Sequence, residues 1–275
     1  MSDLAVITGT THGIGRVTAR ELTMAGREVV MLCRDVSTAH AVRDEIIARV
    51  PRASIHVVHC DLASLASVRE SAEIVRREFG RIALLINNAG IVSSWRRMSP
   101  DGFELTFATN HLGPFLLTQL LLDRIESPGR IINVASRVHY RGKLDLEQLG
   151  NPKARYSGVA AYARSKLANV MHTFALARRL HGTQITANCL HPGVVASNLL
   201  PQWLRLIKPL LSPTMFDVER GARTTLYCAL SAELAAVSGR YFDKNQQPQP
   251  ASALANDPTL QERLWKMSEE WTGMS

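Results

Sequence analysis

The chain has no run of 18 apolar residues, so we expect no membrane-spanning helix. It opens directly into the apolar residues 4–7, without the regions of a signal peptide, which favours a cytoplasmic protein. Lysine is scarce, and no basic cluster is longer than a pair such as Arg76-Arg77, which excludes a basic arm for nucleic acid. The excess of arginine over lysine favours a GC-rich bacterial source. The net charge of +8 suits an anionic ligand such as a nucleotide phosphate.

Cysteine is also rare, and no two cysteines form a Cys-x-x-Cys pair. We expect reduced, buried packing residues at all four positions. The four are Cys33, Cys60, Cys189 and Cys228. His56 and His59 have the spacing of a metal-binding pair, but their surroundings predict a strand. Because an odd separation in a strand places two side chains on opposite faces, we expect no metal site there.

Residues 1–275 have the composition of one globular domain, with 46% hydrophobic and 20% charged residues. Short apolar runs alternate six times with helix-compatible segments, which predicts a Rossmann-like, doubly wound parallel sheet with helices on both faces. The predicted strands are residues 4–8, 28–33, 55–60, 82–86, 129–136 and 184–190, with 239–242 as a seventh. The predicted helices are residues 14–25, 37–50, 65–79, 101–125, 159–181, 217–232 and 257–271. We expect the polar residues 246–250 to form a loop.

A glycine-rich turn follows the first strand, in the pattern Gly9-x-x-x-Gly13-x-Gly15. Strand, turn and helix in this order suit a pyrophosphate, because glycine lets the backbone approach closely and a helix N-terminus offers free N–H groups. The spacing differs from the commoner Gly-x-Gly-x-x-Gly, so an ordinary turn is the alternative at this point.

The second predicted strand ends at Cys33 and is followed by Arg34 and Asp35. A carboxylate at such a strand end binds the 2′-hydroxyl of the adenine ribose in NAD, whereas an arginine accommodates the 2′-phosphate of NADP. Arg34 therefore favours NADP. Asp35, one position later, is the counter-evidence and keeps NAD open.

Polar or small residues also follow the later strands. These positions are Asp61-Leu62, Asn87-Asn88-Ala89-Gly90, Ser136 and Pro192-Gly193. Ligands of open parallel sheets bind at the carboxyl ends of the strands. The sequence therefore predicts that these residues gather at one edge of the sheet.

Tyr162 and Lys166 lie four residues apart in the predicted helix 159–181, so their side chains share one helix face. An ammonium beside a phenol lowers the pKa of the phenol, which makes Tyr162 a candidate proton donor or acceptor for alcohol and carbonyl chemistry. The alternative is a surface lysine one turn from a half-buried tyrosine.

Asn110 is a second special position, because Pro114 bends the predicted helix 101–125 and frees a backbone carbonyl. The alternative is an ordinary polar residue within a helix.

Residues 198–213 are apolar, contain three prolines and are too short to span a bilayer. Such a segment is a lid over an apolar substrate, a patch that contacts a membrane surface or a partner, or a packed loop with short helical turns. The lid interpretation, over residues 194–216, predicts a moderately large apolar substrate.

Together these residues resemble the short-chain dehydrogenase/reductase family along nearly the whole chain. The resemblance rests on Thr8-Gly9-x-x-x-Gly13-Ile14-Gly15, Asp61-Leu62, Asn87-Asn88-Ala89-Gly90, Asn110, Ser136, Tyr162-x-x-x-Lys166 and His191-Pro192-Gly193. Four further features are similar to the retinol dehydrogenase-like branch. They are Cys33-Arg34-Asp35, the long interval from Ser136 to Tyr162, Ser165-Lys166-Leu167-Ala168-Asn169, and Gly239-Arg240-Tyr241-Phe242 with Glu262-Arg263-Leu264-Trp265.

The resemblance implies four catalytic residues. Ser136 would bind the substrate oxygen, Tyr162 would transfer the proton, and Lys166 would lower the tyrosine pKa and hold the nicotinamide ribose. Asn110 would fix a water molecule that links Lys166 to solvent.

The resemblance also implies a cofactor site. Its residues would be Gly9, Thr11, Gly13, Ile14 and Gly15 at the pyrophosphate, Arg34 at the 2′-phosphate, Asp61 and Leu62 at the adenine, Asn87 and Gly90 at the ribose with Tyr162 and Lys166, and Pro192, Gly193 and Val195 at the nicotinamide amide.

We therefore expect an NADP(H)-dependent oxidoreductase that transfers hydride between nicotinamide and an alcohol or carbonyl group. The family implies a homodimer or homotetramer. The alternative is a nucleotide-binding sensor or scaffold with the same fold and no turnover. The intact set of four catalytic residues argues against a sensor, which has no need of all four.

Overall fold

The structure is a computed structural model that describes residues 3–146, 155–193 and 217–274. Within these ranges, one sheet has eight strands in the order β3-β2-β1-β4-β5-β6-β7-β8. All neighbours are parallel except β7 and β8. The strands are β1 (Leu4–Thr8), β2 (Glu28–Cys33), β3 (Ile55–His59), β4 (Ile82–Asn87), β5 (Ile125–Val134), β6 (Ile185–Leu190), β7 (Tyr241–Phe242) and β8 (Pro248–Gln249). The predicted doubly wound parallel sheet is confirmed.

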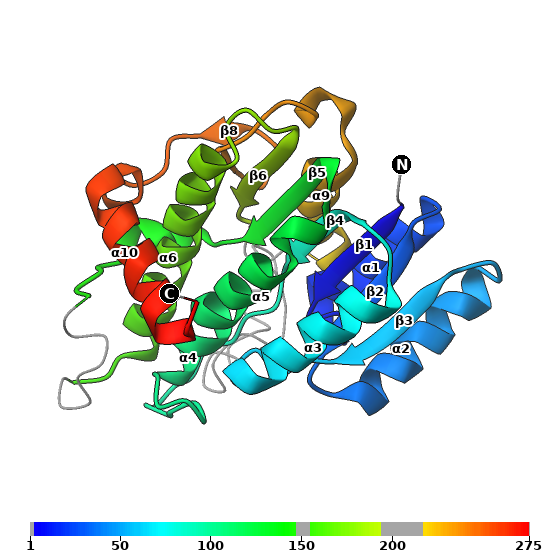
Figure 1. Cartoon of the computed structure of the whole chain (residues 1–275), viewed down its shortest axis with the longest axis horizontal. Coiled ribbons are helices and arrows are strands. Elements are labelled where there is room, and N and C mark those ends of the chain that lie inside the picture. The colour runs from blue at the N-terminus through cyan, green and yellow to red at the C-terminus, as the bar shows by residue number, and fades with distance from the viewer. Residues whose placement is uncertain (1–2, 147–154, 194–216, 275) are drawn as a thin grey trace.

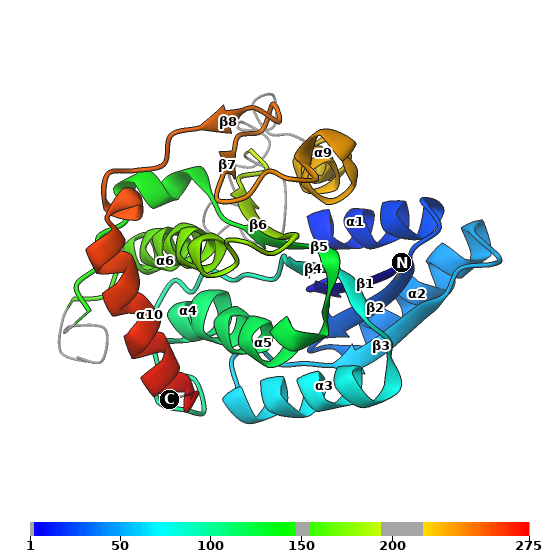
Figure 2. The same ribbon diagram turned by 45° about the horizontal axis from the view of Figure 1, so that its top comes forward.

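Helices cover both faces of the sheet, as Figures 1 and 2 show. One face is packed by α1, α2 and α9, and the other by α3, α5 and α6, with α10 against α5 and α6. The helices are α1 (Gly13–Met24), α2 (Val36–Arg49), α3 (Leu65–Glu78), α4 (Leu105–Phe107), α5 (Gly113–Leu121), α6 (Gly158–Arg179), α9 (Val218–Leu230) and α10 (Pro258–Thr272).

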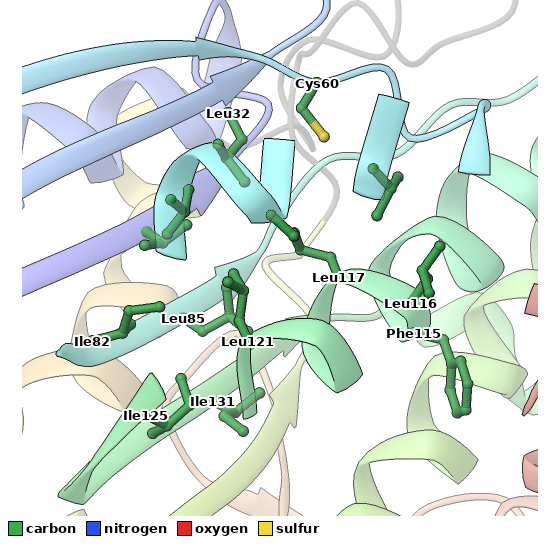
Figure 3. Packing of buried hydrophobic residues seen from close by; sticks show 14 of the residues in the cluster. Leu32, Cys60, Ile82, Leu85, Phe115, Leu116, Leu117, Leu121, Ile125 and Ile131 are labelled. Atoms are coloured by element: carbon green, nitrogen blue, oxygen red, sulfur yellow. The ribbon is translucent and has the colours of Figure 1, made fainter. Parts of the chain in front are cut away.

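Side chains of β1 alternate between two hydrophobic cores. Leu4 and Val6 enter the core beneath α3, α5 and α6, whereas Ala5 and Ile7 enter the core beneath α1, α2 and α9. Figure 3 shows side chains of α5, β4 and β5 packed together in the first core. Because both faces are covered, the central strands are continuously apolar in sequence, as is typical of parallel sheets.

The predicted helix 101–125 is wrong, because the chain forms several shorter elements there. After α4, residues Ala108–Leu112 form a π-helical turn, and the Gly113 N–H donates to the Ala108 carbonyl. Pro114 occupies the position whose N–H would bond the Asn110 carbonyl in an α-helix, and proline has no such hydrogen. The irregularity expected near Asn110 is thus present as a π-helical turn, and the free backbone carbonyl expected there stays a prediction. A short 3₁₀ turn, Leu122–Arg124, then leads into β5.

The loop prediction for residues 246–250 is also wrong in part. Pro248–Gln249 forms β8, which pairs antiparallel with Tyr241–Phe242. The Asp243 carboxylate accepts the backbone N–H groups of Asn245 and Gln247 and so organises the turn between the two strands. These hydrogen bonds of Asp243 fix the turn, so that the polar residues after it can pair with β7 at the sheet edge.

A chain of buried side-chain hydrogen bonds joins α5, β4, β5 and α6. The Asn87 amide donates to Thr118 at 2.9 Å and to Asn133 at 2.8 Å. The Asn133 amide donates in turn to Thr173 at 2.9 Å. A buried polar group costs free energy unless it has a hydrogen-bond partner. Each residue of this network therefore depends on its neighbour for a partner.

We predict that Asn133→Ala lowers the free energy of unfolding by about 3 kcal/mol, because it removes two buried hydrogen bonds, one with Asn87 and one with Thr173, and leaves one buried N–H of Asn87 unpaired. Urea denaturation measures the change. Asn245→Ala, at an exposed position in the β7–β8 turn, is the control and should change stability by less than about 0.5 kcal/mol. Equal effects of the two substitutions would contradict the assigned role of Asn133.

Candidate active site

The first turn is tied to the end of β4 by side-chain hydrogen bonds. The Thr8 hydroxyl accepts the backbone N–H groups of Asn88 and Ala89, each at 3.0 Å. The Asn88 amide donates to the carbonyls of Thr8 at 2.9 Å and Gly9 at 3.0 Å. Asn88 was expected at this edge of the sheet as part of Asn87-Asn88-Ala89-Gly90, but no role was predicted for its side chain. The signal was present, since a second asparagine after a buried strand needs partners for its amide.

Glycine is required at two positions of this turn by the close approach of the backbone. Gly9 has a φ of 72°, and a Cβ atom there would lie 2.8 Å from the Ala89 Cβ. A Cβ atom on Gly15 would lie 2.2 Å from the Gly9 carbonyl oxygen. The turn between β1 and α1 is therefore a narrow backbone cradle at a helix N-terminus, which fits a dinucleotide pyrophosphate.

At the end of β2, Arg34 and Asp35 are both exposed but differ in their contacts. Asp35 caps α2, and its carboxylate accepts the Thr38 N–H at 3.0 Å and the Thr38 hydroxyl at 2.6 Å. These bonds hold the pKa of Asp35 below its usual value. The Asp35 carboxylate is thus engaged by its own helix, while Arg34 forms no ion pair with a carboxylate in the described ranges.

In the turn before α1, the side chain of Thr11 bonds the His12 ring at 3.0 Å. Gly13 begins α1 with a φ of 58°, and Ile14 lies in the first turn of that helix. The residues predicted to line the pyrophosphate thus lie together at the start of α1.

Two predicted cofactor residues direct their side chains into the protein. Leu62 is 6% exposed and belongs to the core beneath α3 and α5. Asn87 is 4% exposed and bonds Thr118 and Asn133. The structure thus leaves only backbone atoms of these two residues for a cofactor. Asp61, by contrast, is half-buried, and its carboxylate accepts the Ala63 N–H at 3.0 Å.

The Asn110 side chain connects three elements. Its amide oxygen accepts the Ile91 N–H at 2.8 Å, and its nitrogen donates to the Ile91 carbonyl and the Ser165 hydroxyl, each at 3.0 Å. Gly90 lies beside it, and a Cβ atom there would lie 3.2 Å from the Lys166 ammonium. The segment after β4 is therefore held against α6, with space kept beside Lys166.

Lys166 and Tyr162 lie together near the end of β5. The Lys166 ammonium is buried, donates to the Val134 carbonyl at 2.7 Å and lies 5.6 Å from the centre of the Tyr162 ring. Burial lowers the pKa of Lys166 to about 8. The tyrosine and lysine predicted from their spacing therefore do share one helix face.

The expected direction of the Tyr162 pKa shift is wrong for this structure. Removal from water raises the pKa of Tyr162 to about 12, and a hydrogen bond with the Ser136 hydroxyl acts in the opposite direction. The Lys166 ammonium lies over the ring and donates to a backbone carbonyl, so burial dominates. Tyr162 is consequently a neutral phenol at pH 7, which can donate a proton.

Beyond the end of β6, Gly193 has a φ of 87°, and its N–H donates to the His191 ring at 3.1 Å. Pro192 lies between them and completes the sharp turn at this edge. The predicted contact of Val195 and the predicted lid over residues 194–216 lie outside the described residues.

Three further features predicted from the sequence concern the cysteines, a metal site and a membrane-spanning helix. All four cysteines are buried and free, as predicted. In the described part of the chain, no group of three or more histidine, cysteine or acidic residues could hold a metal ion. No helix within the same ranges is long and apolar enough to cross a membrane.

We predict that Gly15→Ala weakens binding of a nicotinamide dinucleotide about tenfold or more, because the new methyl group collides with the Gly9 carbonyl and distorts the cradle. Titration of the nucleotide fluorescence measures the affinity. Gly80→Ala is the matched control, since a Cβ atom at Gly80 meets nothing within 4 Å. Equal affinities of both variants and the parent would show that the nucleotide does not use this turn.

Known proteins resemble this chain along nearly its whole length. Residues 3–205 match the family model for short chain dehydrogenases. Retinol dehydrogenase 12 of Mus musculus is 41% identical, over 98% of this chain and 86% of its own length.

Two solved structures share the fold. A protein of Mycobacterium paratuberculosis has a TM-score of 0.81 and 35% identity, over 98% of this chain and 93% of its own. A blue fluorescent protein from a metagenomic library, solved with NADPH, has a TM-score of 0.70 and 28% identity, over 87% of this chain and 95% of its own. Since the family match spans the sheet edge that carries the glycine turn, Ser136 and Tyr162, this chain belongs to the short-chain dehydrogenase family.

Proposed function

We propose that this protein is an NADP(H)-dependent oxidoreductase that transfers hydride between nicotinamide and an alcohol or carbonyl group of a moderately large apolar substrate. The observation that carries the proposal is the grouping of Ser136, Tyr162 and Lys166 at the same sheet edge as the glycine cradle. The name of the retinol dehydrogenase relatives supports an alcohol or carbonyl substrate with a large apolar part.

Some residues of this edge would bind the cofactor, and others would take part in the reaction. The Gly9–Gly15 turn would hold the pyrophosphate, and Gly90 leaves room for a ribose beside Lys166. When bound, a nicotinamide supplies the hydride through its ring carbon C4. The protein then has to position the substrate carbon and provide or accept one proton.

In the reducing direction, the Ser136 hydroxyl donates a hydrogen bond to the substrate carbonyl oxygen and polarises it. The neutral Tyr162 phenol donates its proton to that oxygen as the alcohol forms. The Lys166 ammonium, fixed by the Val134 carbonyl, stabilises the negative charge left on the phenol. In the oxidising direction, the phenolate accepts the hydroxyl proton and the same contacts act in reverse.

Asn110 has a positioning role in this mechanism. Its side chain is fully engaged with Ile91 and Ser165, so only its backbone carbonyl is offered to a water molecule on the way to Lys166. Such a water would return the proton to Tyr162 from solvent between turnovers.

We predict that Tyr162→Phe lowers kcat for carbonyl reduction about a hundredfold or more, because it removes the proton donor. Steady-state oxidation of NADPH with aldehyde and ketone substrates measures the change. Tyr227→Phe is the control, since the Tyr227 hydroxyl bonds Glu233 after α9, away from the site. Parental turnover by Tyr162→Phe would refute the mechanism.

We further predict that Arg34→Ala weakens NADPH binding about tenfold or more and changes NADH binding by less than about twofold. The reason is that only NADPH has the 2′-phosphate that the exposed guanidinium would contact. Parallel titrations with both nucleotides measure this. Equal losses for the two nucleotides, or a parent protein that prefers NADH, would redirect the assignment to NAD.

A further inference from the structure

A cavity of about 880 Å³ opens beside Ser136 at the carboxyl ends of β5, β6 and β7. Among its described lining residues, three are cationic and one is anionic. These residues are Arg137, Arg141 and Lys244, with Asp243 as the carboxylate. A cavity that adjoins the proposed catalytic serine and carries excess positive charge differs from a purely apolar substrate pocket.

Hydrogen bonds anchor the turn that carries the two arginines. They begin and end the 3₁₀ turn Arg137–Arg141, which directly follows Ser136. Within this turn, His139 is fully buried, and its ring bonds the Ser136 carbonyl at 2.9 Å and the Ser252 N–H at 3.3 Å. The Tyr140 hydroxyl donates to the Pro250 carbonyl. Such anchoring reduces the ordering cost of binding a ligand between fixed groups.

The described carboxylate of the cavity does not form an ion pair with either arginine. The Asp243 carboxylate is directed to its own turn, where it accepts the N–H groups of Asn245 at 2.8 Å and Gln247 at 3.0 Å. His191 is neutral at pH 7, because burial lowers its pKa to about 4. Within the described ranges, neither Arg137 nor Arg141 forms an ion pair with a carboxylate.

This basic group is separate from the residue proposed to bind the cofactor phosphate. Arg34 follows β2, whereas Arg137 follows β5, and β1 and β4 lie between these strands. Three strand spacings correspond to about 14 Å. The 2′-phosphate that Arg34 would contact therefore cannot also contact Arg137 and Arg141.

We propose that the natural substrate carries an oxoanion, a carboxylate or a phosphate, remote from its reacting carbonyl, and that Arg137 and Arg141 bind it. This inference rests on the proposed function. The substrate would be amphipathic, with an apolar body between the carbonyl at Ser136 and the anion at the 3₁₀ turn. Guanidinium groups suit this task because they form paired hydrogen bonds with oxoanions.

The test compares three aldehydes of equal medium chain length, an ω-oxoalkanoate, its methyl ester and an ω-oxoalkyl phosphate. With NADPH, we expect kcat/KM of the parent for an anionic probe to exceed that for the ester about tenfold, mainly through KM. The two anionic probes distinguish carboxylate from phosphate recognition. Added salt should reduce the preference, because it screens exposed charges.

Substitutions of the two arginines test whether they cause the preference for anionic probes. Arg137→Gln and Arg141→Gln should each lower the ratio of anionic to ester kcat/KM about threefold or more, and Arg141→Lys should restore part of it. Arg52→Gln is the control, since it removes the same charge from an exposed residue before β3, at the opposite edge of the sheet. The Arg52→Gln control should keep the parental ratio of anionic to ester kcat/KM.

Equal kcat/KM values for the anionic and neutral probes in the parent would overturn the oxoanion site, while turnover of either would leave the proposed oxidoreductase function standing. A ratio that falls equally in Arg52→Gln would also overturn it, by showing a general charge effect. Absence of turnover with all three aldehydes and both NADPH and NADH would overturn the proposed function and this inference together.

Discussion

Parallel pairing of the central strands is the constraint on which the rest of this structure depends. Because β1 to β7 run in one direction, their carboxyl ends lie at one edge, and the residues after each strand become neighbours. The contact of Asn88 with the Thr8 and Gly9 carbonyls shows how closely these ends approach. Helices on both faces then exclude water from the two faces of the sheet and leave this edge open.

Burial sets the electrostatics of the site more strongly than spacing does. Lys166 keeps its place because the Val134 carbonyl accepts its hydrogen bond, yet removal from water lowers the lysine pKa and raises the tyrosine pKa. Both shifts favour the less charged form of each group. The site therefore starts from a neutral acid beside a cation, a state that suits protonation of a substrate oxygen.

Local sequence patterns predicted the sheet and most helices, because each depends on hydrophobic period or on glycine and proline chemistry. The roles of the site residues came from the resemblance to a family and stay predictions. They did not predict side-chain direction at strand ends. Asn87 turns inward because Asn133, on the neighbouring strand, offers its amide oxygen. The break before α5 and the pairing of β8 likewise depend on few residues and on contacts distant in sequence.

A single-turnover experiment tests the central claim most directly. The protein is saturated with NADPH, mixed with an equal amount of an aldehyde probe, and the oxidation of the bound nucleotide is followed together with the product. The account predicts that one equivalent of NADPH is oxidised for each equivalent of alcohol formed. Bound NADPH that stays reduced with every carbonyl compound of a broad panel would contradict the account and favour a nucleotide-binding sensor.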